Sequence, residues 1–527
     1  MYSSMRKALI VAFSLICLGD AFGSGSLPLR VSIRRDTYNA DPLSSNPTLQ
    51  ILPDLFLALY RPSSDGSHFF PALAENAPVR IKGAFGSTGY HVRLRAAKWS
   101  DGTPITSDDV GYTFSVIEKD HKSSLRELIC DSQGCWAFKK INRLEFQLFS
   151  RKYPEAMLDR LSQIFIVPQA SHKKKSFLQN PVVSGAYKVK TWVHQRAIEL
   201  IANPHAIFPP QTKRKIYFSF QDLNSIAQAA SGGRLDIAYA APEHQRRFKR
   251  STTKYIAKYP YPSAVSITIN RARFNQEQSQ QIYKCLEFIQ KEYLRRVVFF
   301  GYHQEVKIAN TYWHPDIPFS KGLKEKANPS SSTPTCNIKN SLTILTEAGF
   351  EEYQKVLSFV KNSLQKTGIN LKFRFVSPSS IREWLNFRKS NKVWDLYLGE
   401  WPASRSKYFP DFSAVFGEFP TDIKYSENIA SYQNNKVQQL VKALLVSPAH
   451  QRTKILEELQ LAFLSDLPSF PLYFIEDAFI LGKNVTIKGF KDCRASCTNS
   501  TTHGMEYVIK EKMINHVMRW YPETIKM

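Results

Sequence analysis

The sequence predicts an α/β protein of two or three domains, and three observations lead to this class. The chain has 527 residues, far more than one hydrophobic core organises. Its hydrophobic content of 43% and charged content of 22% are those of an ordinary globular protein. A strand pattern, a helical stripe and a second strand pattern follow one another over residues 342–375. Such a unit predicts parallel strands joined by a right-handed crossover.

Residues 1–23 have the features of a cleavable export signal. Two basic residues precede an apolar run over 8–18, and Ala21-Phe22-Gly23 supplies the small residues that a signal peptidase reads. The run is shorter than the roughly 20 apolar residues that a membrane-spanning helix needs. Cys17 follows Ile16, where a lipidation site has a small residue. We therefore expect an exported chain without a lipid anchor.

Charge and cysteine content describe the mature chain further. The net charge is +26, and the basic residues are scattered apart from clusters at 172–175 and 246–250. Most of this charge is expected to be solvated surface; attraction to an anionic envelope or to acidic ligands are the alternatives. Because the chain is exported, nucleic acid is not an expected partner.

The cysteines outside the export signal are expected to form disulfides in an oxidising compartment. Close spacing favours the pairs Cys130–Cys135 and Cys493–Cys497, which leaves Cys285–Cys336 by elimination. A metal site would need two close ligand pairs at regular spacing, and these segments lack it. No metal and no cofactor is expected.

The most informative stretch runs from Tyr90 to Phe114. Alternating apolar residues at its start predict a half-buried strand. Asp101-Gly102 supplies the positive φ of a tight turn. Thr106 is placed to cap a helix whose third residue is Asp109, a variant of the capping box.

Within this stretch the string AKWSDGTPITSDDVGYTF, residues 97–114, resembles the signature of the peptide/nickel family of extracellular solute-binding proteins, the oligopeptide-binding proteins of ABC importers. Four further segments resemble the family in the same order, and the resemblance extends over nearly all of residues 24–490. These segments are Asp41-Pro42, Pro71–Glu75, Gly185-Ala186-Tyr187 and Ser231–Ala238.

The resemblance implies a two-lobed α/β fold like that of periplasmic binding proteins, with an extra third subdomain and a two-strand hinge. Lobe I would comprise residues 24–62, 178–265 and 481–527, with the extra subdomain at 63–177 packed on it. Lobe II would comprise 266–480. The strands that cross between the lobes are expected at 264–270 and 468–480.

Residue patterns place the other elements. Strands are expected at residues 29–33, 187–192, 197–201, 342–346, 369–375 and 395–399. Helices are expected at 52–60, from about 223, at 276–301, at 350–364 and, as two helices split at Ser447-Pro448, within 430–467. Residues 115–175 are expected to hold helices and the small loop between Cys130 and Cys135.

The resemblance also implies a ligand site. Trp401 matches a family tryptophan that binds the ligand backbone, but Ser404 stands where the family has the acid that pairs with the ligand amine. Glu400 stands where the family has glycine, and either Glu400 or Asp411 could supply the missing carboxylate. The full set of candidate ligand-binding residues is Trp384, Glu400, Trp401, Pro402, Ala403, Ser404, Asp411 and Tyr473.

The function implied is that of a periplasmic, monomeric, non-enzymatic binding protein. It would bind oligopeptides between the lobes and deliver them to an inner-membrane ABC permease. Because the amine-binding acid is changed, cell-wall peptides are an alternative ligand, and nickel and haem are others known within such a family. An exported hydrolase is disfavoured, since the sequence contains neither G-x-S-x-G nor H-E-x-x-H.

Overall fold

The structure is a computed structural model, and it describes most of the chain between residues 27 and 482. The described residues are 27–34, 39–44, 51–62, 69–83, 87–120, 123, 125–131, 134–150, 157–210, 212–220, 223–240, 254–286, 306–309, 341–348, 351–365, 369–376, 384, 393–400, 430–447, 449–466, 468–482, 486–487 and 525–526. The expected export signal lies outside them. Within these ranges, the helices are too short or too polar to span a bilayer.

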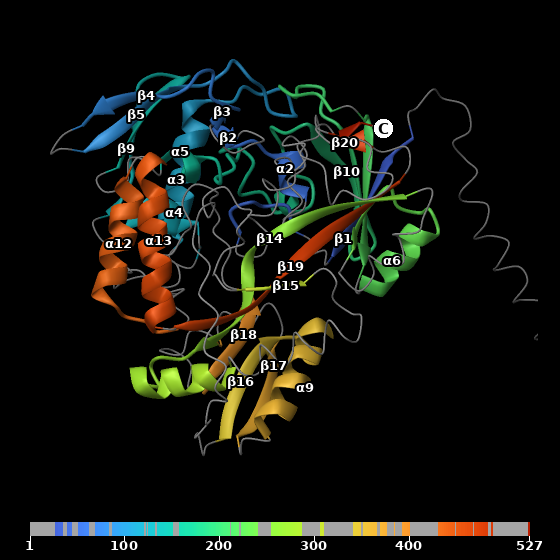
Figure 1. Ribbon diagram of the computed structural model, residues 1–527. Helices are drawn as coiled ribbons and strands as arrows, with labels where there is room; N and C mark the ends of the chain where they lie inside the picture. Colours follow the sequence, from blue (N-terminus) through green and yellow to red (C-terminus); the bar gives the residue numbers. More distant parts are fainter. Residues whose placement is uncertain are drawn as a thin grey trace, which may run out of the picture.

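One sheet of eleven strands runs through both lobes (Figure 1). Its order is β10-β11-β12-β1-β13-β19-β14-β18-β16-β17, with β15 paired to β19. The bounds are β1 Leu29–Arg34, β10 Tyr187–Val193, β11 Ala197–Ala202, β12 Arg214–Phe220, β13 Ile237–Ala240, β14 Lys254–Ile269, β15 Val306–Ile308, β16 Ser341–Glu347, β17 Asn370–Val376, β18 Leu396–Glu400 and β19 Ser469–Gly482. The strands expected from the sequence are present in this sheet, apart from the one expected at the start of the 90–114 stretch, which belongs to the second sheet.

The two central strands, β14 and β19, join the lobes. They run antiparallel along most of their length, and their register shifts between Pro260 and Ala264. In lobe I, the last half of β19 lies between β13 and the first half of β14. In lobe II, the second half of β14 lies between β18 and the first half of β19. The expected pair of crossing strands is therefore confirmed, and its irregular middle is where a hinge would bend.

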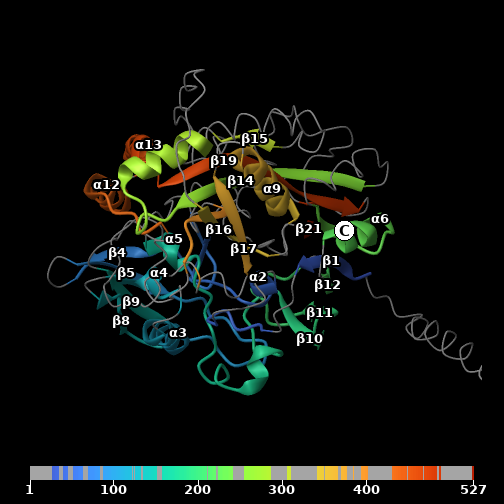
Figure 2. The same cartoon turned by 90° about the horizontal axis from the view of Figure 1, so that it is seen from below.

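A second sheet, ordered β4-β5-β9-β8, forms a separate layer beside lobe I (Figures 1 and 2). Its strands are β4 Val79–Lys82, β5 Thr88–Arg93, β8 Ala137–Lys140 and β9 Glu145–Ser150. The helices and the Cys130–Cys135 loop expected between residues 115 and 175 are present, but the sequence did not predict β8 and β9, a hairpin whose strand β9 pairs with β5. Short two-stranded sheets pair β2 Tyr60–Pro62 with β3 Phe69–Pro71, β6 Cys130–Asp131 with β7 Gly134–Cys135, and β20 Thr486–Ile487 with β21 Ile525–Lys526.

The helices cover the edges and faces of these sheets. Their bounds are α2 Leu52–Leu55, α3 Ser107–Lys119, α4 Arg126–Ile129, α5 Met157–Leu161, α6 Leu223–Ser231, α9 Glu351–Gln365, α12 Asn435–Val446 and α13 Ala449–Asp466, with a 3-10 turn at Lys175–Leu178 and a helical stretch at 276–286. The helix expected over 52–60 ends early, since Phe56 is extended and Ala58 bridges to Phe165. Partners distant in the sequence thus override the local helical pattern.

The tight turn at Asp101-Gly102 and the capped start of helix α3 are present as expected. Gly102 has a φ of +87°. The Asp109 carboxylate accepts hydrogen bonds from the backbone N–H of Thr106 at 2.9 Å and of Gln169 at 2.9 Å, and from Trp99 Nε1 at 3.3 Å. The buried Asp109 carboxylate therefore links the turn, the start of α3 and the loop at Gln169 by hydrogen bonds.

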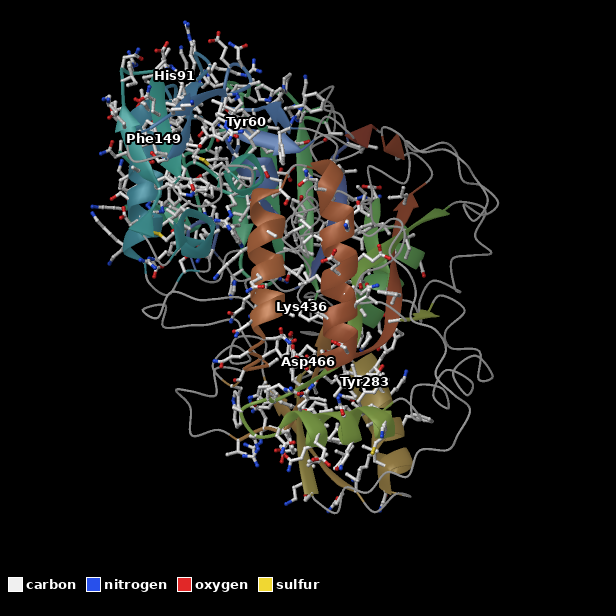
Figure 3. The ribbon with its side chains drawn as sticks, turned by 60° about the vertical axis from the view of Figure 1, so that its left-hand side comes forward. Tyr60, His91, Phe149, Tyr283, Lys436 and Asp466 are labelled. Atoms are coloured by element: carbon white, nitrogen blue, oxygen red, sulfur yellow. A yellow bond between two sulfur atoms is a disulfide. The ribbon has the colours of Figure 1, made fainter. Side chains whose placement is uncertain are left out.

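In lobe II, Asp466 at the end of α13 connects three elements (Figure 3). Its carboxylate accepts from Tyr432 Oη at 2.7 Å, Asn434 Nδ2 at 2.8 Å and Gln276 Nε2 at 2.9 Å. Burial and this carboxylate both raise the pKa of Tyr432. The contact fixes α12 and the helical stretch 276–286 against the start of β19.

Of the expected disulfides, Cys130–Cys135 is present. Cys285 is also disulfide-bonded. Cys336, Cys493 and Cys497 lie outside the described residues, so the pairs Cys285–Cys336 and Cys493–Cys497 stay predictions.

Candidate functional site

The parallel strands of lobe I end toward the middle of the crossing strands. β1 is parallel to β12 and to β13. β13 starts with Ile237 opposite Leu481 and ends with Ala240 opposite Ala478, so its carboxyl end points toward the hinge. The carboxyl ends of all three strands therefore form one edge that faces the junction between the lobes.

The parallel strands of lobe II end toward the same junction from the other side. β16 is parallel to β17 and to β18. β18 starts with Leu396 opposite Ile269 and ends with Glu400 opposite Val265, near the register shift in β14. In open α/β sheets ligands bind beyond the carboxyl ends of the strands. Two such edges that face one junction make this junction the candidate ligand site.

Two of the eight candidate residues, Glu400 and Tyr473, flank the same position of the central sheet. Val265 pairs with Glu400 on one side and with Tyr473 on the other. The three positions therefore form one row across β18, β14 and β19, at the inner end of the lobe II edge. Tyr473 is buried, with 1% of its surface exposed, and it also pairs with Ile308 of β15.

Trp384 lies near the same edge but farther from the crossing strands. Its half-buried ring packs against a cluster of Leu345, Val376 and Trp394, and Val376 is the last residue of β17. The guanidinium of Arg374 lies 4.8 Å from the centroid of the Trp384 ring, a cation–π contact. The remaining candidates, Trp401, Pro402, Ala403, Ser404 and Asp411, follow β18 and lie outside the described residues.

Sequence reasoning missed a polar chain behind the lobe I edge. Asp41, in the loop after β1, has its Oδ1 3.0 Å from His172 Nε2, and His172 Nδ1 is 2.9 Å from Tyr112 Oη. Burial raises the pKa of Tyr112, and the Asp41 charge adds to this. This network of Asp41, His172 and Tyr112 connects the loop after β1 with α3. No local pattern pairs residues this far apart, although the Asp-Pro motif had marked Asp41.

A fully buried ion pair lies deeper in lobe I. Lys215 Nζ lies 2.8 and 3.1 Å from the two carboxylate oxygens of Asp54, and Tyr217 Oη donates to Asp54 Oδ2 at 2.7 Å. Burial raises the pKa of Asp54, and Lys215 offsets only part of this. Because the side chains of Lys215 and Asp54 are only 2% and 1% exposed, we interpret this pair as a support that holds α2 against β12.

The described residues contain no group of three or more His, Cys, Asp or Glu side chains arranged to hold a metal ion.

The comparisons with known proteins agree with this architecture. Residues 70–284 match the family of bacterial extracellular solute-binding proteins, family 5 Middle. The chain is 22% identical over 412 residues to the "Probable D,D-dipeptide-binding periplasmic protein DdpA" of Escherichia coli, covering 75% of this chain and 77% of that protein. It is 24% identical over 441 residues to the oligopeptide-binding protein AppA of Bacillus subtilis, covering 78% and 79%.

Solved structures share the fold. The peptide-binding protein AppA of Clostridium difficile superposes with a TM-score of 0.71 at 18% identity, covering 92% of this chain and 98% of that one. The Bacillus subtilis AppA, solved with a nonapeptide, gives 0.70 at 20% identity, covering 90% and 98%. NikZ of Campylobacter jejuni, solved with Ni(L-His), gives 0.70 at 19%, covering 92% and 99%. At these identities the likeness establishes the two-lobed α/β fold.

Proposed function

We propose that the chain, whose residues 70–284 match the bacterial extracellular solute-binding proteins of family 5, binds peptides between its two lobes and delivers them unchanged to an ABC permease in the inner membrane. The protein would act in the periplasm, as a monomer. Its family consists of binding proteins, so no catalytic group is required of the site. We assign lobe I to residues 24–62, 178–265 and 481–527, the extra subdomain to 63–177 and lobe II to 266–480.

The observation that carries this proposal is the pair of strand-end edges on either side of β14 and β19. A ligand held by both edges is covered from two sides when the lobes approach, and binding shifts the open–closed equilibrium. An extended peptide suits such a site, because its main chain can hydrogen-bond with little regard to its sequence. Peptides are also what AppA and DdpA bind, according to their names.

We propose that the segment directly after β18 holds the ligand. Trp401, Pro402 and Ala403 would lie along the peptide backbone, and Ser404 would replace the family acid. The ligand amine then needs another carboxylate, since an unpaired buried charge is strongly unfavourable. Glu400 and Asp411 are the two candidates. Trp384 and Tyr473 would line side-chain pockets.

Calorimetric titration of the mature, exported chain with peptides tests this function. Unmodified peptides of three to five residues should bind, and the same peptides with acetylated amines should bind at least tenfold more weakly. Cell-wall peptides ending in D-alanyl-D-alanine and Ni(L-His) complete the panel. Mass spectrometry of the released ligand should recover it intact. Absence of binding to every peptide, or cleavage of the peptide, would overturn the proposal.

Substitutions of the candidate residues test which of them bind the peptide and which carboxylate pairs with its amine. Trp401→Ala should weaken peptide binding strongly, while Lys139→Gln, on the exposed face of β8, should leave it unchanged. Glu400→Gln and Asp411→Asn distinguish the two amine partners: the true partner loses its preference for a free over an acetylated amine. If neither substitution changes that preference, the assignment of the amine site is wrong.

A further inference from the structure

A cavity of about 450 Å³ opens beside the turn that follows β5. It lies between residues 95–98 and the loop at 205–207. Its walls are Glu75, Arg95, Ala96, Ala97, Lys98, His205 and Ile207. The volume lies within the range of about 300–1,000 Å³ that is usual for small-molecule sites.

Three side chains of this wall, Arg95, Lys98 and His205, carry nitrogen atoms that can bond to a ligand. Within the described part of the chain, the side-chain hydrogen bonds of Arg95 come from its Nε, which donates to the carbonyls of Ala72 and Ala74, each at 3.0 Å. Among the described residues, no protein group is bonded to the two terminal nitrogens of Arg95, to Lys98 Nζ or to the ring of His205. The donors are therefore available to a ligand.

The backbone holds these groups in place. The backbone N–H of Arg95 donates to the carbonyl of Leu73 at 2.9 Å, and Lys98 pairs with Pro104 across the signature turn. Asn203 anchors the facing loop, since its side chain donates to the carbonyl of Gly185 and accepts from the N–H of His205. The three donor side chains are thus mounted on two segments held by backbone hydrogen bonds, which lowers the entropy lost when a ligand binds.

The cavity has little compensating negative charge. Among the described residues that line it, Glu75 is the acidic one, and Arg93 Nε lies 2.9 Å from the Glu75 carboxylate. Asp101, in the adjoining turn, accepts from the backbone and hydroxyl of Thr103. Arg95 and Lys98 have no carboxylate partner within the described residues, and a bound anion would supply the opposite charge.

We propose that this cavity is a second ligand site, which binds the phosphate group of a small organic phosphate ester. The planar fork of Arg95 suits two phosphate oxygens, while Lys98 supplies a point charge and His205 a further donor. Ala96, Ala97 and Ile207 form an apolar wall for the organic part of the ester. The site also gives one part of the +26 charge a specific role.

Titration with glycerol 3-phosphate, inorganic phosphate and glycerate tests the site. Glycerol 3-phosphate should bind, glycerate at least tenfold more weakly because it carries a single negative charge. Lys98→Gln and His205→Gln should each weaken phosphate-ester binding, Lys98→Gln by about tenfold or more. Lys139→Gln removes the same charge from an exposed strand outside the cavity and should change nothing.

The source of the phosphate is distinguished by a second arm with anionic phospholipid vesicles. Vesicle binding that is lost in Lys98→Gln assigns the site to a lipid headgroup, whereas binding of glycerol 3-phosphate alone assigns it to a soluble ester. The proposal is overturned if neither glycerol 3-phosphate nor the phospholipid vesicles bind, or if glycerate binds as tightly as glycerol 3-phosphate. It is also overturned if Lys139→Gln weakens binding as much as Lys98→Gln. Peptide binding, measured in parallel, should be unaffected by the Lys98 and His205 variants.

Discussion

Replacing Asp54 by Asn should destabilise the protein strongly, because it leaves the Lys215 ammonium buried without a counter-charge. The two side chains are 1% and 2% exposed, and three donor contacts converge on the carboxylate at 2.7–3.1 Å. Breaking a buried pair by changing one partner typically costs about 3–5 kcal/mol. We expect a loss of that size in the free energy of unfolding, measured by urea denaturation.

The same cluster provides its own controls. Tyr217→Phe removes one donor to the carboxylate and should cost about 1.5–3 kcal/mol. The triple variant Asp54→Leu, Lys215→Met, Tyr217→Phe removes both charges and the hydroxyl together. It should recover most of the stability, since buried ion pairs replaced by apolar groups of similar volume are often neutral. A loss below about 1 kcal/mol for Asp54→Asn, or a triple variant no more stable than Asp54→Asn, would refute the reasoning.

Three further predictions concern stability and use the same urea measurement. A Cβ on Gly185 would clash with the backbone oxygen of Asp54 in α2, so Gly185→Ala should cost about 1–3 kcal/mol. Gly232→Ala, whose Cβ would lie 3.5 Å from its nearest neighbour, should cost little, and equal losses would contradict the steric argument. Replacing Cys130 and Cys135 by Ser opens a loop with a sequence separation of 5, which should cost about 2 kcal/mol; no loss at all would show that the loop is held by its packing. Burial raises the pKa of Glu199, but hydrogen bonds from its two basic partners outweigh this and leave the pKa below its ordinary value. This stabilisation is present above the unfolded-state pKa and lost as pH falls through the folded-state pKa. The unchanged protein should therefore lose more stability on acidification from pH 6 to pH 3 than Glu199→Gln, and equal losses would count against the ion pair.

Local patterns were enough wherever the interactions that make an element are close in the sequence. The turn at Gly102 needs only a residue that tolerates positive φ, and α3 starts where Asp109 bonds the N–H of Thr106, three residues away. The parallel pair β16 and β17 followed from a strand, a helix and a strand in succession. The two crossing strands came instead from the resemblance to a known family.

Tertiary structure decided the rest, because the deciding partners are far away along the chain. The helix expected over 52–60 stops at Leu55, since Ala58 bridges to Phe165. The pairs Asp41–His172 and Asp54–Lys215 join residues 131 and 161 positions apart. No pattern read within one segment contains such information, as it depends on how the strands of the sheet are ordered.

The candidate site combines both kinds of information. The sequence alone determined that a strand ends near Glu400, that another carries Tyr473, and that the segment after Glu400 resembles a ligand-binding segment. Only the register of β14 with its two neighbours put Glu400 and Tyr473 on either side of Val265. The physical reason is that strand pairing is a contact between distant segments, whereas strand formation depends mainly on alternation within one segment.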